Sequence, residues 1–179
     1  MSIEHFPKIW LPRTGQVTSF ATGDDGYFQA GNPRKTRFVD NGNGTITDRA
    51  TGLTWVKEPG ACGGNFGSAG SPSAMTWANA VAECLALTYA GYSDWRLPNA
   101  LELLSLADPE TATIPRINTT FFPSTQVANY WTGTSYHNAP TYANIVAYGQ
   151  YYLSLGVTTK TPTTAFVRPV RGGRINANW

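Results

Sequence analysis

The sequence predicts an α+β fold in which two helices pack on short antiparallel sheets connected by long loops. Strand-like segments fill residues 37–56, helix-like segments fill 75–87 and 99–108, and strand-like segments return over 129–171. Strands and helices are therefore grouped along the chain, which is typical of α+β proteins and excludes an alternating βαβ fold. The 18 glycines and 12 prolines indicate many turns. We expect an extended N-terminal arm over 1–36, one domain over 37–174 and a tail over 175–179.

Composition limits the kind of partner and the location. Charged residues make up 13% of the chain and the net charge is +2, which is too small to favour nucleic acid. Polarity comes instead from Thr, Ser, Asn and Tyr, as on many extracellular proteins. No run of about eighteen apolar residues is present, so no membrane span is expected. Residues 1–10 lack the apolar core of a signal peptide. We therefore expect an extracellular, cell-surface or virion-surface location without a visible signal peptide.

The arm is rich in turn-forming residues. Asp24, Asp25 and Gly26 are a turn signal, which we interpret as an exposed turn rather than a cation site. The apolar segment 9–11 is suited to docking on the domain or on a neighbouring subunit.

The first part of the domain predicts a hairpin followed by a third strand. Residues 37–40 and 45–48 form the two hairpin strands, and 41–44 supply a turn that tolerates positive φ. Residues 53–56 form the third strand, in which we expect Trp55 to be structural.

The segment 75–87 predicts an amphipathic helix with Thr76 as its N-cap. Trp77, Cys84 and Leu85 recur at helical spacing and predict its buried face.

The two cysteines, Cys62 and Cys84, allow two interpretations. We favour a disulfide between the Gly-rich loop and the helix, because the composition looks extracellular. It would close a loop of about twenty residues and contribute about 3 kcal/mol. The alternative is two buried free thiols. Two cysteines with the distant His5 and His137 do not predict a zinc site.

The segment 91–99 joins the two helices and contains several chemically capable side chains. We interpret Asp94, Trp95 and Arg96 as structural, with an ion pair between Asp94 and Arg96 and an indole that fixes the turn.

The second helix is expected to begin after Asn99, which forms a capping box with Glu102. Leu101, Leu103 and Leu104 are expected to face the core. The helix should end at 108, before a proline.

The last third predicts several strands and is rich in tyrosine. The expected strands are 129–136, 143–148, 151–155 and 164–171, and six of the nine tyrosines fall between 130 and 152. Tyr and Asn make adaptable contacts at low entropic cost, and aromatic faces stack on sugar rings. We therefore predict a ligand-binding surface here, the alternative being that these tyrosines fill a sheet packed on both faces. The candidates are Tyr136, His137, Asn138, Tyr142, Asn144, Tyr148, Tyr151 and Tyr152.

The C-terminal part is mildly basic, because no acidic residue follows Glu110. Arg168 and Arg171 are expected on one strand and are candidates for contact with an anionic group of a ligand. The alternative is an ion pair with Asp40 or Asp48.

No pattern in the sequence predicts catalysis. We find no paired carboxylates, no nucleophile with a neighbouring base and no cluster of metal ligands. We therefore expect no enzymatic activity, no metal and no cofactor.

Six motifs, taken together and in order, resemble the C-terminal domain family of the Legionella collagen-like adhesin, a large bacterial and phage family. They are residues 38–48 (FVDNGNGTITD), 51–55 (TGLTW), 76–77 (TW), 91–98 (GYSDWRLP), 130–132 (YWT) and 167–171 (VRPVR). The pattern covers 37–171, and the stretch 11–26 is similar to the lead-in often seen before it.

The resemblance implies a C-type-lectin-like fold, related to formylglycine-generating enzymes and to the variable proteins of diversity-generating retroelements. Members are mostly extracellular binding modules, and the named adhesin binds sulfated glycosaminoglycans and is trimeric through its collagen-like part. In the variable relatives, surface diversity lies in the last third. This chain departs from these patterns, because it has no collagen-like repeat, no Glu-Pro-Asn or Trp-Asn-Asp calcium motif, and no cysteine in its second half.

Two functions follow as expectations. The first is a non-enzymatic extracellular binding module that recognises a glycan or a cell-surface protein through the C-terminal strands and loops. The second is a structural subunit of an extracellular appendage, fibre or phage tail tip, which self-associates through residues 1–36.

Overall fold

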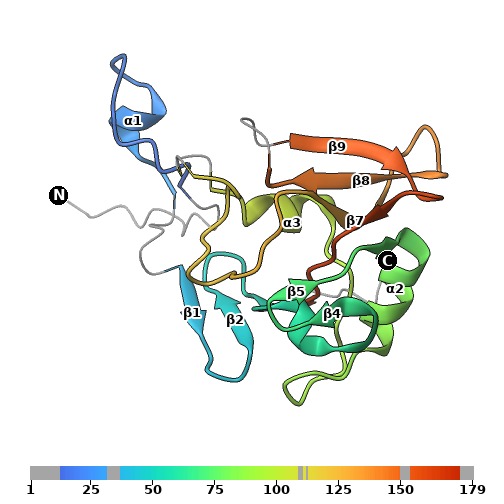
Figure 1. Cartoon of the computed structure of the whole chain (residues 1–179). Coiled ribbons are helices and arrows are strands. Elements are labelled where there is room, and N and C mark those ends of the chain that lie inside the picture. The colour runs from blue at the N-terminus through green and yellow to red at the C-terminus, as the bar shows by residue number, and fades with distance from the viewer. Residues whose placement is uncertain (1–12, 32–36, 109–110, 112, 150–153, 174–179) are drawn as a thin grey trace.

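The computed structural model describes residues 13–31, 37–108, 111, 113–149 and 154–173. Small antiparallel sheets and a few short helices make up this part of the chain, as the α+β prediction requires (Figure 1). The two longest helices are α2 (Trp77–Ala86) and α3 (Ala100–Ser105), and single 3-10 turns cover Pro59–Cys62 and Gly64–Phe66.

The larger sheet joins the beginning of the domain to its end. It contains β1 (Phe38–Asp40), β2 (Thr45–Asp48), β3 (Leu53–Val56) and β11 (Val170–Gly172), in the order β1-β2-β3-β11. The predicted hairpin is confirmed, because β1 and β2 pair antiparallel around the 41–44 turn. Pairing of β11 with β3 closes the sheet on the chain's C-terminal side.

The second sheet is formed by β7 (Asn129–Ser135), β8 (Tyr142–Ala147) and β9 (Ser154–Thr159), in that order. The strand predicted at 151–155 overlaps β9, and residues 150–153 lie outside the described part of the chain. Two further pairs are β4 (Gly67–Ser68) with β5 (Ser71–Pro72), and β6 (Met75–Thr76) with β10 (Thr164–Ala165).

The continuous strand predicted over 164–171 is wrong, because the chain changes sheets within it. β10 pairs with β6, whereas β11 pairs with β3. Between them, the Phe166 carbonyl accepts a hydrogen bond from the Trp131 N–H (2.9 Å) and the Pro169 carbonyl accepts one from Val56 (3.1 Å). Proline has no N–H to donate, which suits a crossing segment better than a paired strand.

Both predicted helix starts are confirmed. The Thr76 hydroxyl accepts the Asn79 N–H at the start of α2, and Asn99 forms a full capping box at the start of α3. The side-chain assignments are partly wrong. Leu85 is 65% exposed and Leu101 is 73% exposed, whereas Leu103 is fully buried.

Helix α3 ends at Ser105, earlier than the predicted boundary at 108. The N–H groups of Leu106 and Ala107 turn back to the carbonyls of Leu103 and Leu104, which tightens the last turn.

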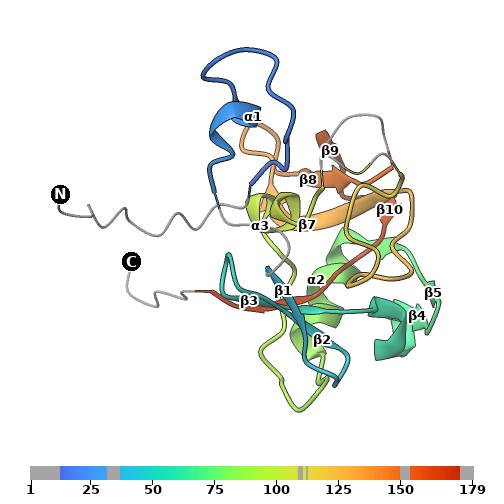
Figure 2. The same cartoon turned by 90° about the vertical axis from the view of Figure 1, so that its left-hand side faces the viewer.

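The core has two parts. One lies between α2 and the β7–β9 sheet and contains Cys84, Trp95 and Trp131. The other lies around α3, between the two sheets, and contains Trp55 and Leu103. Figures 1 and 2 both place α3 between the β7–β9 sheet and the β1–β3 strands. Burying indoles of this size contributes much of the apolar stabilisation.

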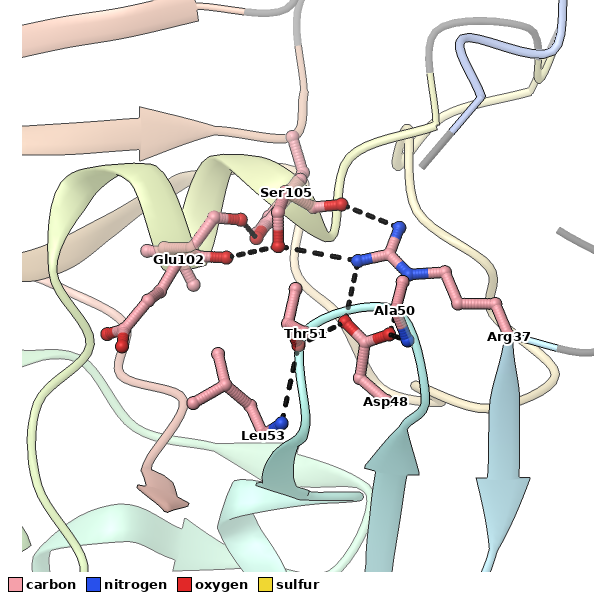
Figure 3. A network of polar contacts seen from close by, with 9 residues as sticks. Arg37, Asp48, Ala50, Thr51, Leu53, Glu102 and Ser105 are labelled. Atoms are coloured by element: carbon pink, nitrogen blue, oxygen red, sulfur yellow. Dashed lines mark hydrogen bonds and ion pairs between the residues drawn. The ribbon is translucent and has the colours of Figure 1, made fainter. Parts of the chain in front are cut away.

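A buried ion pair attaches the larger sheet to α3. Asp48 accepts two hydrogen bonds from Arg37 and one from the Ala50 N–H. The same guanidinium donates to the Ser105 carbonyl at 2.8 Å (Figure 3). Because neither charged group reaches water, their mutual contacts replace the lost hydration.

The arm contains a one-turn helix, α1 (Asp25–Phe28), where the sequence predicts only an extended segment with an exposed turn. The Asp24 carboxylate accepts the N–H groups of Phe20 (2.7 Å) and Tyr27 (2.8 Å). These hydrogen bonds lower the pKa of Asp24. Both views show this part of the arm projecting away from the two sheets (Figures 1 and 2).

Candidate functional site

An open hollow of about 420 Å³ lies beside the connection between β7 and β8. We call it the β7–β8 hollow, and it is lined by Tyr136, Ala139, Tyr142 and Val157. Its walls are two phenol rings and two small apolar side chains, a lining suited to the apolar face of a ligand.

The connection between the strands holds the two tyrosines in place. The Tyr136 N–H donates to the Tyr142 carbonyl (3.0 Å), and the Tyr142 N–H donates to the Ala139 carbonyl (2.9 Å). Tyr142 then begins β8 opposite Thr159 of β9. Because side chains alternate along strands, Tyr142 and Val157 project on the same face of the sheet.

Lys160 is fixed next to the hollow. Its ammonium donates to the Ser135 hydroxyl (2.7 Å) and lies 3.9 Å from the centre of the Trp77 ring. Its backbone N–H donates to the Thr141 carbonyl (2.9 Å). The cation is therefore positioned by a hydroxyl, an aromatic face and the neighbouring strand connection.

The 91–99 segment positions β7 and thereby the hollow. The Pro98 carbonyl accepts the Gly133 N–H (2.7 Å), and the Thr134 hydroxyl accepts the Ala100 N–H (3.1 Å). At this point the β7–β8 register shifts between Trp131 and Ser135. Such a bulge redirects the end of a strand, here the end that carries Tyr136.

The structure gathers several of the predicted ligand-binding residues and separates others. Tyr136, His137, Asn138 and Tyr142 lie in or beside the strand connection, and the rings of Tyr136 and His137 meet edge to face at 5.2 Å. Asn144 is half-buried on β8. Tyr151 and Tyr152 lie outside the described residues.

The prediction that Tyr148 contacts ligand is wrong. Its side chain is fully buried, and its hydroxyl donates to the Leu103 carbonyl (2.8 Å). Burial raises its pKa. Tyr148 directly follows β8 and faces the core at α3, whereas Tyr142, the first residue of β8, is exposed.

The prediction that Arg168 contacts an anionic ligand is also wrong. Its side chain is fully buried and donates to the carbonyls of Val56 (2.9 Å) and Lys57 (2.7 Å) and to the Thr125 hydroxyl (2.8 Å). Burial lowers the pKa of the guanidinium. The alternative pairing with Asp40 or Asp48 is wrong as well.

Those two carboxylates have other partners. Asp40 pairs with Lys57 (2.7 Å) and Asp48 pairs with Arg37 (2.7 Å).

Arg171 is partly exposed, but its guanidinium is already engaged. It makes two hydrogen bonds to Asp94, at 2.6 and 3.1 Å, and lies 3.7 Å from the centre of the Tyr92 ring. The predicted pair of Asp94 with Arg96 is therefore wrong, since Arg96 pairs with Glu102 at 2.7 Å. Arg171 and Asp94 are 77 residues apart in the sequence. The start of α3 lies between Arg96 and Glu102.

Trp55 and Trp95, which we interpret as structural, are both buried. Trp55 is fully buried and Trp95 is 1% exposed, with its indole N–H donating to the Tyr89 carbonyl (3.2 Å).

The predicted disulfide is wrong, because Cys62 and Cys84 are both free thiols. Cys84 is buried on α2, and Cys62 packs against the same apolar cluster. Burial raises the pKa of each thiol to about 12. They behave as small apolar side chains, the alternative that the sequence had left open.

Sequence reasoning missed Val157, Ala139 and Lys160. A signal for Lys160 was present, since it is the one charged residue in the sequence between Arg116 and Arg168. Val157 could not be found without knowing that β9 pairs with β8.

Among the described residues, no group of three or more His, Cys, Asp or Glu side chains is placed to hold a metal ion. No helix in the same part of the chain is both long and apolar enough to cross a membrane.

Comparison with known proteins gave one match. A family model described as the Lcl C-terminal domain matches residues 44–171. This range falls within the 37–171 span of the six motifs, so the resemblance drawn from them is confirmed. No curated protein and no solved structure matched the chain.

Proposed function

The chain belongs to the Lcl C-terminal domain family, and from this premise we propose that it is a non-enzymatic, adhesin-like binding module that acts outside the cell or on a surface. The observation that carries the proposal is the β7–β8 hollow, where Tyr136 and Tyr142 form the walls of an open, largely apolar surface. Its lining holds no acid, base or nucleophile with a positioned partner, which favours binding over catalysis.

A glycan suits this surface better than a protein segment. The rings of Tyr136 and Tyr142 offer faces for the C–H groups of a sugar, while Lys160 and Ser135 lie next to them as polar partners. The hollow is open and has a volume of about 420 Å³, within the range of sites that hold small ligands. A cell-surface protein remains the competing ligand.

A glycan array with matched variants tests the site. Tyr142→Ala and Tyr136→Ala are expected to weaken binding at least about tenfold, because each removes an aromatic wall. Tyr27→Ala is the control, since Tyr27 is also exposed but lies on the arm. Binding that survives both hollow substitutions would place the site elsewhere, and a wild-type chain that binds cell-surface protein but no glycan would overturn the ligand class.

The C-type-lectin-like fold is a further part of the proposal. It is supported by the family resemblance and by the pairing of β11 with β3, which brings the two ends of the matched region together. An experimental structure compared with C-type lectins tests it, and a different order of strands would contradict it.

A second candidate function is a structural subunit of an extracellular appendage, fibre or phage tail tip. One observation favours it: four large apolar side chains on the arm face solvent. We call them the arm cluster: Val17 (71% exposed), Phe20 (85%), Tyr27 (58%) and Phe28 (65%). A folded segment that presents such a cluster is typical of a docking surface.

Hydrogen bonds keep that segment folded. Asp24 caps it, and the Arg13 side chain donates to the Gly31 carbonyl (3.2 Å), which joins its two ends. Gly26 packs so closely on the Thr18 carbonyl that an added Cβ would lie 2.2 Å from the oxygen.

Light scattering after size exclusion tests this candidate. The candidate is supported if the wild-type chain assembles and the double variant Phe20→Ser with Phe28→Ser does not. The control variant Leu101→Lys should assemble as the wild type does. A wild-type chain that remains monomeric would contradict it.

A further inference from the structure

Strand β9 (Ser154–Thr159) is an edge of the β7–β9 sheet. All six of its residues pair with β8, from Ser154 opposite Ala147 to Thr159 opposite Tyr142. Within the described residues, no strand pairs with its other side. Figure 1 shows β9 running along the outside of the molecule. An edge of this kind leaves alternate N–H and C=O groups able to pair with another strand.

The sequence of β9 lacks the features that usually protect an edge strand. Its six residues, SLGVTT, include no charged residue and no proline. Leu155 is 48% exposed and Val157 is 44% exposed. The two residues are two positions apart, so their side chains project on the same face.

We propose that β9 pairs antiparallel with β9 of a second copy of this chain, with Gly156 at the centre of the pairing. In this register Leu155 lies opposite Val157 of the partner subunit, and Val157 lies opposite Leu155 of the partner subunit. Four partly exposed apolar side chains then share one face of a continuous sheet built from three strands of each copy.

Charge and symmetry favour a second copy over an unrelated strand. Lys160 is the first charged residue after the strand. Antiparallel pairing puts the two Lys160 ammonium groups at opposite ends of the contact, whereas parallel stacking would bring them together. The central Gly156 lies against Ile145, where a Cβ would be 3.3 Å from Cγ1, and so adds no side chain between the copies. Both copies use the same surface, so the contact is isologous and forms a closed dimer with twofold symmetry.

The pairing also bears on the β7–β8 hollow. Val157 lines the hollow and lies next to Leu155 along the strand face. Leu155 of the partner subunit would lie beside Val157 and extend the apolar wall of the hollow. The pairing itself does not depend on what the hollow binds.

Sedimentation velocity over a series of concentrations tests the proposal. The wild-type chain is expected to form a dimer, and Leu155→Lys is expected to raise its dissociation constant by about 100-fold, because two apolar side chains per dimer are replaced by charges on an edge. Leu101→Lys is the matched control, since it makes the same change on an exposed face of α3. Far-UV circular dichroism checks that each variant is folded.

The register has its own test. The double variant Leu155→Cys with Val157→Cys is expected to form a disulfide-linked dimer under oxidation, and Leu155→Cys alone to form much less. A wild-type chain that is monomeric at every concentration overturns the proposal. The proposal is also overturned if the chain associates but Leu155→Lys leaves that association unchanged. This includes the case in which association is lost only when the arm cluster is changed. If a variant lost glycan binding but still formed the dimer, the result would bear on the proposed ligand site in the β7–β8 hollow and would leave the β9 pairing supported.

Discussion

Arg37 and Asp48 face each other in a fully enclosed, two-point ion pair. The Arg37 Nε lies 2.9 Å from one carboxylate oxygen of Asp48 and the terminal nitrogen lies 2.7 Å from the other, with side chains 3% and 0% exposed. The pair spans the first hairpin and reaches α3 through Ser105 (Figure 3). The larger sheet and the helix that lies under the β7–β9 sheet are thus joined through one guanidinium.

We expect Asp48→Ala to lower the free energy of unfolding by about 3–5 kcal/mol, because it leaves the Arg37 charge buried without a partner. Asp40→Ala is the control. Its pair with Lys57 has side chains that are 39% and 32% exposed, and its loss should cost under about 1 kcal/mol. Urea denaturation of both variants measures the difference. Similar small losses for the two would contradict the structural role given to Arg37 and Asp48.

Arg168→Lys should destabilise the fold by about 2–4 kcal/mol. The guanidinium joins two backbone carbonyls and a hydroxyl across 43 to 112 residues of sequence, and an ammonium cannot reproduce that fork. Arg171→Lys, at a partly exposed pair, should cost under about 1 kcal/mol. Thermal and urea unfolding measure both. Equal effects would mean that Arg168 is not an internal anchor.

Asp94→Asn should change how stability depends on pH. The hydrogen bond from Arg171 lowers the pKa of Asp94, so the folded state favours the carboxylate. A depressed pKa in the folded state adds stability above the unfolded value of about 3.9 and loses it as pH falls toward the folded value. The difference between wild type and variant should therefore be present at pH 7, stay under about 1 kcal/mol, and shrink below about pH 4. Urea titrations from neutral to acid pH measure it, and a constant difference would contradict the pair.

Both cysteines should react slowly with iodoacetamide in the native protein. A pKa raised to about 12 leaves very little thiolate at pH 8, and Cys84 is also fully buried. Denaturant should expose two reactive thiols per chain, counted by mass spectrometry, and a reductant should not shift the thermal midpoint. A midpoint that falls on reduction would indicate a bonded pair instead.

Features set by a few neighbouring residues could be predicted from the sequence. The 41–44 turn, the Thr76 cap and the Asn99–Glu102 capping box depend on interactions within about one turn of chain, and the structure contains all three. The strand connection around Tyr136 and Tyr142 was also within reach, because its aromatic and turn-forming residues are local.

The burial and the hydrogen-bond partners of individual side chains could not be predicted from the sequence. Tyr142 begins β8 and Tyr148 directly follows its end, and the two look alike in sequence, yet one is 39% exposed and the other is fully buried. Arg168 and Arg171 are also close to each other in the sequence. Arg168 nevertheless donates to backbone carbonyls inside the core, whereas Arg171 pairs with Asp94 at the surface.

The sequence by itself determined the α+β class, the two helix starts, the first hairpin and the family to which the chain belongs, since these depend on short motifs and their order. Only the tertiary structure decided which tyrosines face solvent, which carboxylate each arginine meets, and that β9 forms an edge. Those outcomes depend on which distant segment covers each face of a sheet. α3 covers Tyr148 and leaves Tyr142 open, and no local pattern records that choice.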